Sequence, residues 1–75
     1  THSLVIRHYN RVGVLAGVLD LLRREEINVE EMENTIFEDA QAACCTLQLD
    51  SSPSESTLTA LQESDSILQV MLGSR

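Results

Sequence analysis

The sequence predicts an α+β domain of the ferredoxin-like type, with the element order β-α-β-β-α-β. Three observations support this prediction. The length of 75 residues suffices for one small domain. Two amphipathic helical patterns alternate with four short segments that have the composition or the alternation of strands, and the middle two of these follow each other directly. We expect both helices on one face of a four-stranded antiparallel sheet, with the other face uncovered.

The amino-terminal half is expected to contain a strand, a helix and a second strand. Residues 4–8, Leu-Val-Ile-Arg-His, are rich in branched apolar side chains and predict the first strand. Apolar residues then recur on one helical face and predict a helix over 12–25, whose last turn carries two arginines that suit the helix dipole. Residues 29–37 alternate in polarity, and although their glutamates also suit a helix, the closing Asn-Thr-Ile-Phe favours a strand.

The carboxyl-terminal half is expected to contain a strand, a weaker helix and a last strand. Residues 42–49 alternate, so Cys44 and Cys45 should point to opposite faces of the sheet, and this strand should form a hairpin with the preceding one. A proline at a first helical position, flanked by serines that can cap, predicts a helix near 53–63. Residues 67–72 predict the closing strand.

Composition excludes several functional classes. The chain carries twelve acidic residues against five arginines and no lysine, and its net charge of −7 would repel a phosphate backbone. One Phe, one Tyr and no Trp offer no platform for stacking bases, so nucleic acid is not an expected partner. Because no apolar stretch approaches the roughly 18 residues of a membrane span and no basic leader is seen, we expect no membrane contact.

The two cysteines indicate a reducing compartment. Cys44 and Cys45 are neighbours whose side chains point to opposite sides of a strand, which is a poor geometry for a mutual disulfide or for two ligands of one metal ion. We interpret them as reduced packing residues, and we expect a cytoplasmic protein with no metal site.

Other functions found on this topology fit the sequence poorly. An RNA-recognition module needs aromatic residues on its central strands, and a soft-metal carrier needs two cysteines in the first strand-to-helix loop, which here reads His-Tyr-Asn-Arg. A phosphatase-like enzyme could hold phosphate with Arg11 and the helix amino terminus, but no further catalytic group supports it. The sequence has no nucleophile-base pair and no Gly-x-Gly-x-x-Gly fingerprint, so we predict no catalytic residue and no cofactor in this chain.

The loop before the first helix is the best candidate for a ligand site. Gly13 has no side chain, so it lets a ligand approach the first helical amides, which attract carboxylate. His8 and Asn10 supply polar groups beside it, and Asn28 supplies another at the entrance to the second strand. We expect Asn28 to lie far from His8 within one chain, but the two could meet across a two-fold axis between two copies.

These residues resemble the signature of ACT domains. The segment from His8 to Leu15 reads His-Tyr-Asn-Arg-Val-Gly-Val-Leu, and Ile-Asn-Val follows after one helix. More narrowly, the whole chain is similar to the carboxyl-terminal regulatory ACT domains of D-3-phosphoglycerate dehydrogenases. One departure is Val12, which stands where that family usually has proline. Val12 restores a backbone N–H and removes a fixed φ angle, so we expect it to shape, with Gly13, a slightly looser loop.

The resemblance implies a specific function. In that family two ACT domains pair side by side into one continuous sheet, and L-serine binds at their interface as a feedback inhibitor of serine biosynthesis. By position, His8 and Asn10 match the loop residues that hold the ligand. Asn28 matches the residue contributed across the interface, and Gly13 matches the loop glycine. The resemblance thus implies that residues 1–75 are one non-catalytic regulatory domain of a homodimer, whose further partners are the catalytic domains of an NAD-dependent parent enzyme.

Each assignment has a plainer alternative. His8 could face solvent or cap the strand end, Asn10 could cap the first helix, and Asn28 could occupy a turn. The apolar stripe of the first helix is expected in the core, and Arg11 and the glutamates of the second strand are expected as surface charges. The chain as a whole could be a structural dimerisation module that keeps the fold and has lost the ligand.

Overall fold

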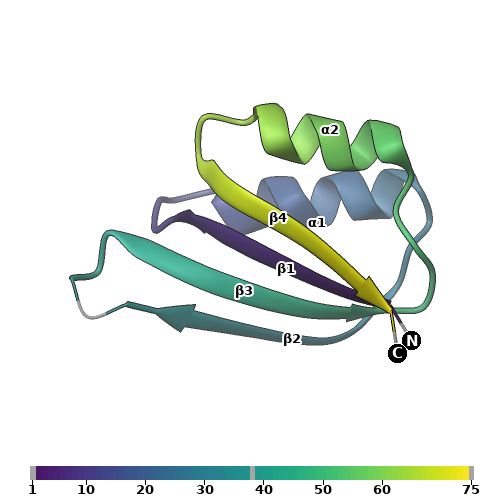
Figure 1. Ribbon diagram of the computed structural model, residues 1–75, viewed down its shortest axis with the longest axis horizontal. Coiled ribbons are helices and arrows are strands. Elements are labelled where there is room, and N and C mark those ends of the chain that lie inside the picture. The colour runs from purple at the N-terminus through teal and green to yellow at the C-terminus, as the bar shows by residue number, and fades with distance from the viewer. Residues whose placement is uncertain (1, 38, 75) are drawn as a thin grey trace.

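The computed structural model describes residues 2–37 and 39–74, and its elements follow the predicted order (Figure 1). Their bounds are β1 His2–Tyr9, α1 Val14–Arg24, β2 Val29–Ile36, β3 Ala42–Leu49, α2 Glu55–Glu63 and β4 Ile67–Ser74. The four strands form one antiparallel sheet in the order β2-β3-β1-β4, with β2 and β3 as a hairpin. This arrangement confirms the predicted ferredoxin-like fold.

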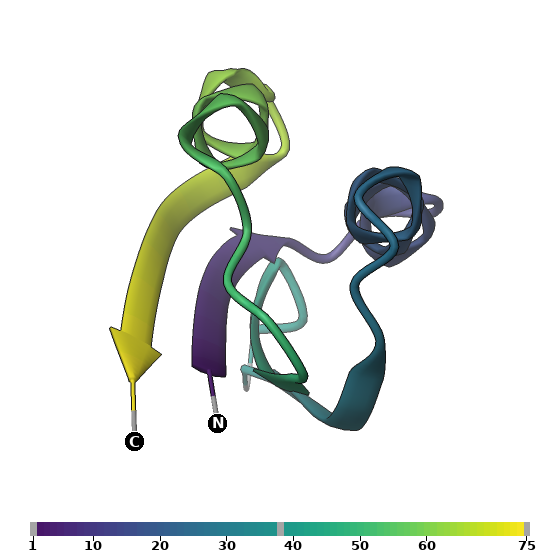
Figure 2. The same cartoon turned by 90° about the vertical axis from the view of Figure 1, so that its right-hand side faces the viewer.

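Both helices cover one face of the sheet, which we call the helix face (Figures 1 and 2). Seen end-on, α1 lies toward the β2 side and α2 toward the β4 side. No described element covers the opposite, bare face. The core between helices and sheet consists of buried apolar side chains: Leu4, Ile6, Val18, Leu22, Ile27, Cys45, Leu47, Leu49 and Leu61. Neither described helix is long and apolar enough to span a membrane.

β3 shows the predicted alternation most clearly. Cys45 and Leu47 are buried against the helices, whereas Cys44 and Thr46 are half-buried on the bare face. The predicted separation of the two cysteines is therefore confirmed. Burial, with a smaller contribution from the neighbouring Cys44, raises the pKa of the Cys45 thiol. Cys45 accordingly behaves as an unreactive packing residue.

The helices begin two residues later than the sequence predicted, because backbone conformation at the caps decides the boundary. Gly13 is left-handed, with φ of 85°, and it leaves Val12 fully exposed in the loop before α1. Pro53 is buried in front of α2 rather than inside it. Ser54 holds the capping position, and its Oγ accepts a hydrogen bond from the N–H of Thr57 at 3.3 Å.

Candidate functional site

The β1–α1 loop, residues 10–13, delivers the chain to the amino terminus of α1. Gly13 occupies the N-cap position, and no side chain among the residues that the structure describes caps the helix there. The first turn, Val-Leu-Ala, contains no acidic residue. The N–H of Val14 makes a long bond of 3.4 Å to the carbonyl of Arg11, and the N–H groups that follow it carry the positive end of the helix dipole without a side-chain acceptor among the described residues.

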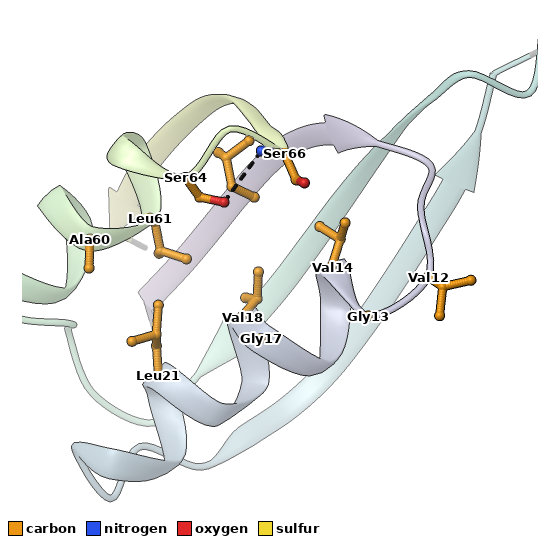
Figure 3. A pocket seen from close by; sticks show the side chains of 11 residues that line it. Val12, Gly13, Val14, Gly17, Val18, Leu21, Ala60, Leu61, Ser64 and Ser66 are labelled. Carbon is orange, nitrogen blue, oxygen red and sulfur yellow. Dashed lines mark hydrogen bonds between the residues drawn. The ribbon is translucent and has the colours of Figure 1, made fainter.

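A groove runs from this loop between the two helices (Figure 3). Its volume of about 310 Å³ is at the small end of the range for ligand pockets. Val14, Val18 and Leu21 line it from α1, and Leu61 lines it from α2. Ser64 and Ser66 add polar groups to this apolar lining, and the open amides of α1 lie at the end of the groove that is next to the loop.

His8 is buried on the helix face, with 2% of its surface exposed. Its Nδ1 donates to the carbonyl of Tyr9 at 2.9 Å, and its Nε2 lies 3.0 Å from Oδ1 of Asn34 on β2. Because a neutral imidazole has one N–H, a bond to Oδ1 needs the imidazolium form, while rotation of the amide lets Asn34 donate to a neutral ring. In either form both ring nitrogens are engaged within the chain, so His8 does not face solvent, and its bond to Tyr9 lies at the end of β1.

Asn10 connects the loop to the β2–β3 hairpin. Its backbone N–H donates to the carbonyl of Gln41 at 2.9 Å, and its Nδ2 donates to the carbonyl of Ala40 at 3.0 Å. Ala40 has φ of 61°, a left-handed conformation that residues with a Cβ adopt rarely, so these bonds stabilise a strained turn. Asn10 does not cap α1, since Gly13 holds that position. No donor among the described residues reaches its Oδ1.

Asn28 lies at the other end of the sheet. Its backbone N–H donates to Oδ1 of Asp50 at 3.0 Å, and its carbonyl accepts from the N–H of Asp50 at 3.1 Å. The register places the Asn28 end of β2 beside Leu49 of β3, whereas His8 pairs with Ala43. Six positions along a strand correspond to about 20 Å. One chain therefore does not bring Asn28 to the loop, as the sequence predicted.

Two further features complete the loop. Arg11 stacks its guanidinium over the ring of Tyr9, 4.4 Å from the ring centroid, and this cation–π contact holds the charge at the surface of the loop. Within residues 2–37 and 39–74, no three His, Cys, Asp or Glu side chains gather in a way that could hold a metal ion. The loop thus offers helix amides, one amide side chain and one cation, which is chemistry suited to a small anionic or zwitterionic ligand.

Asn34 was not among the predicted site residues. It pairs with Cys45 across the hairpin and reaches His8 only because both side chains lie on the helix face. The burial of His8 could have been predicted from the sequence, because its side chain lies on the same face of the strand as those of Leu4 and Ile6, which are buried. The register that brings Asn34 opposite β3 could not be read from the sequence.

Comparison with known proteins places this geometry among solved structures. No family model matches the sequence, and no curated protein matches it. A structure described as GqqA, a novel type of quorum quenching acylases, aligns with a TM-score of 0.71 at 23% identity. An unknown protein from Galdieria sulphuraria aligns at 0.74 and 14% identity. The ACT domain from GTP pyrophosphokinase of Chlorobium tepidum aligns at 0.68 and 12% identity.

The coverage of these alignments indicates what kind of unit the chain is. Each alignment covers 95% of this chain. The chain spans only 38% and 42% of the first two proteins but 94% of the Chlorobium ACT domain. The likeness shows the fold: the chain has the fold and the size of an ACT domain.

Proposed function

We propose that this chain is a non-catalytic regulatory ACT domain that binds a small amino acid between two copies of itself. The observation that carries the proposal is the open amino terminus of α1 behind Gly13, on a chain with the ACT-domain fold. Unpaired amides at a helix start bind carboxylate without any charged side chain. An amino acid supplies that carboxylate together with an ammonium group that side-chain oxygens can accept.

Side-by-side pairing through β2 completes the site. A second copy that runs antiparallel along β2 places its own residue 28 beside the Ile36 end of the first copy, where the β1–α1 loop lies. Met32 and Ile36 are 43% and 53% exposed at this edge of the sheet, and Leu19 is exposed on the side of α1 that faces away from the groove. We call these three residues the β2 flank. Their burial would favour the pairing.

Asn28 and Asn10 are the side chains best placed to act. Both backbone bonds of Asn28 go to Asp50, so its exposed amide is available to a second copy. Asn10 keeps its Nδ2 on the hairpin and offers Oδ1 to the ammonium group of the ligand. Asn10 and the amides of α1 from one copy would thus face Asn28 from the other.

His8 acts in a more limited way. Its Nε2 can reach a ligand only if the ring exchanges the Asn34 amide for a ligand group. Ligand capture by His8 would therefore release Asn34 on β2, at the edge where the second copy pairs. Gly13 and Val12 place no side chain over the amides of α1, since Gly13 has none and Val12 is fully exposed.

The finer part of the proposal follows from the resemblance of the loop and Asn28 to one ACT family. The effector is L-serine, and the parent is an NAD-dependent dehydrogenase similar to D-3-phosphoglycerate dehydrogenase. NAD and the catalytic groups belong to other domains of that parent. A coupling of about 1–3 kcal/mol between effector and catalytic domain suffices for ordinary feedback.

One observation favours a second candidate function. Both nitrogens of His8 and the Nδ2 of Asn10 already have partners within the chain. A dimerisation module that has lost its ligand would show the same satisfied side chains.

Thermal unfolding with L-serine, D-serine and glycine, combined with light scattering, separates the two candidates. A ligand at a hundred times its Kd adds about 2.7 kcal/mol to the free energy of unfolding. The regulatory domain predicts a dimer whose Tm rises with L-serine by several degrees. Asn28→Ala should abolish that rise and keep the dimer, because the bonds to Asp50 run through the backbone. Gln62→Ala, an exposed amide on α2, is the matched control.

Three outcomes would contradict one or both of the candidate functions, or the identity of the effector. A dimer whose Tm is unchanged by every amino acid would overturn ligand binding and leave the dimerisation module. A rise with another amino acid but not with serine would overturn the finer part alone. A monomer that ignores all ligands would contradict both candidates.

A further inference from the structure

β4 is the edge strand at the side of the sheet opposite β2 (Figure 2). Within the part of the chain that the structure describes, β1 alone pairs with it. The outer side of β4 therefore presents a row of unpaired N–H and C=O groups along its eight residues. Such a row is a template for one kind of partner, an extended strand.

The two edges of the sheet differ in how they are protected. Natural edge strands carry charges, proline, bulges or short lengths that prevent pairing. β2 carries three exposed carboxylates, Glu30, Glu31 and Glu33, so pairing there has to overcome their repulsion through burial of the β2 flank. β4 reads Ile-Leu-Gln-Val-Met-Leu-Gly-Ser, with no charge and no proline, and its register shift lies near its start, opposite Arg7 and His8.

The exposed side chains of β4 are mainly apolar. Leu68, Met71 and Leu72 are 50%, 46% and 43% exposed, respectively. On the neighbouring α2, Leu58 is half-buried against the core and Gln62 is exposed. An uncharged apolar edge of this length is the type of surface that proteins cover.

A second copy of the chain is the occupant that these features favour. Every copy carries a net charge of −7, so most ways of bringing two copies together place like charges against each other. Pairing of two β4 strands avoids this, because neither strand is charged. The sequence of β4 is also self-complementary about its centre. An antiparallel pair centred on Val70 places Gln69 opposite Met71 of the second copy and brings Leu72 beside Leu68, the residue at the register shift of β4.

We propose that β4 is a second assembly edge, at which β4 of another copy pairs antiparallel about a two-fold axis near Val70. The sheet then continues across the β4 edge, and the exposed leucines cover each other. Together with pairing at β2, this edge joins dimers into larger assemblies. The proposal goes beyond ligand binding and does not depend on it.

Sedimentation equilibrium of the 75-residue chain tests the proposal with matched variants at the two edges. Lysine on an edge strand is a natural device against pairing. Gln69→Lys and Leu68→Lys introduce it at exposed positions of β4, and Ile36→Lys introduces it at the exposed end of β2. Each lysine lowers the net negative charge, so a loss of association cannot come from stronger general repulsion. Circular dichroism checks that every variant retains the fold.

The expected result is that Ile36→Lys alone still forms a dimer, with twice the 8.3 kDa mass of the chain. Adding Gln69→Lys to it should raise the dissociation constant at least tenfold, and Leu68→Lys should do the same independently. A monomeric Ile36→Lys chain that is folded, or association unchanged by both β4 lysines, would overturn the proposal. The Tm response to L-serine, recorded on the unaltered chain with its intact β2 edge, reports on the proposed function alone. Its absence, beside an Ile36→Lys chain that still dimerises, would overturn that function and leave the β4 edge standing.

Discussion

The amino termini of α1 and α2 lie at opposite ends of the helix layer and are built differently (Figure 1). α2 begins with Ser54, whose Oγ accepts from the N–H of Thr57, and Glu55 follows in the first turn. The carboxylate of Glu25, at the end of α1, accepts from the N–H of Ser54 at 3.1 Å. α1 begins with Gly13 and has neither an acid in its first turn nor, among the described residues, a side-chain cap.

The start of α2 has a side-chain cap from the protein, whereas the start of α1 has none among the described residues. A cap contributes about 1 kcal/mol, and α1 lacks this contribution. α1 is instead held by its strongly apolar face, from which Val18 and Leu22 are fully buried. α2, with a weaker apolar face, depends more on its cap. The contrast supports the assignment of the α1 amides to an external carboxylate, and it can be tested at each terminus.

The largest effect is expected from a matched pair of glycine substitutions. A Cβ at Gly13 or Gly17 would meet no atom within 4 Å, so the two sites differ only in backbone conformation. Gly13→Ala should destabilise the fold by about 1–2 kcal/mol because its φ is positive. Gly17→Ala should stabilise it by about 0.5–1 kcal/mol, as expected inside a helix. Urea unfolding measures both, and shifts in the same direction would refute the assigned conformation.

Removal of the α2 cap is expected to have the next largest effect. Ser54→Ala takes the acceptor away from the N–H of Thr57, a buried residue, and should lower the free energy of unfolding by about 1 kcal/mol. Ser52→Ala, an exposed serine in the preceding loop, serves as control and should change little. Equal unfolding curves for the two variants would mean that α2 does not depend on this cap.

Closing the α1 terminus should have a smaller effect of opposite sign. Ala16→Glu adds a carboxylate to the exposed first turn and should raise the free energy of unfolding by about 0.3–1 kcal/mol. The same carboxylate would compete with the ligand, so the rise in Tm with amino acid should shrink. Thr59→Glu, at an exposed position of α2, serves as the control for the added charge. A more stable Ala16→Glu protein with an undiminished ligand response would place the ligand away from these amides.

The smallest effect concerns the carboxylate that bridges the two helices. Hydrogen bonds from Thr57, and then from Ser54, lower the pKa of Glu25. A lowered pKa means that the ionised form stabilises the fold at neutral pH and that this contribution disappears as the pH falls below about 4. Glu25→Gln should therefore be less stable at pH 7 and should approach the wild type in acid. Unfolding curves across pH measure this, with Glu26→Gln as control; a constant difference would contradict it.

The elements whose side chains alternate into the core were predictable from the sequence. β3 has the predicted bounds, 42–49, because every second side chain reaches the core. β1 and β4 run longer than predicted, since His2 still pairs with Ser74 beyond the apolar stretches. Such pairing depends on the partner strand rather than on local composition.

The candidate site was predictable as a set of residues but not as a set of contacts. His8 and Asn34 are 26 positions apart and meet only through the strand register. The bond from Asn10 to Ala40 depends on a left-handed turn at a residue type that does not signal one. Local chemistry therefore marked the loop, while the tertiary arrangement decided which of its groups remain free.

The two neighbouring cysteines give the molecule a built-in reporter. Cys45 lies in the core, where burial raises its pKa, while Cys44 lies half-buried on the bare face in register with Arg7. A thiol-alkylating reagent should therefore modify one cysteine and spare its immediate neighbour, which a single mass-spectrometric fragment can show. The alkylation rate of Cys44 then serves as a footprint of the bare face, so coverage of that surface by a neighbouring domain can be timed without introducing any label.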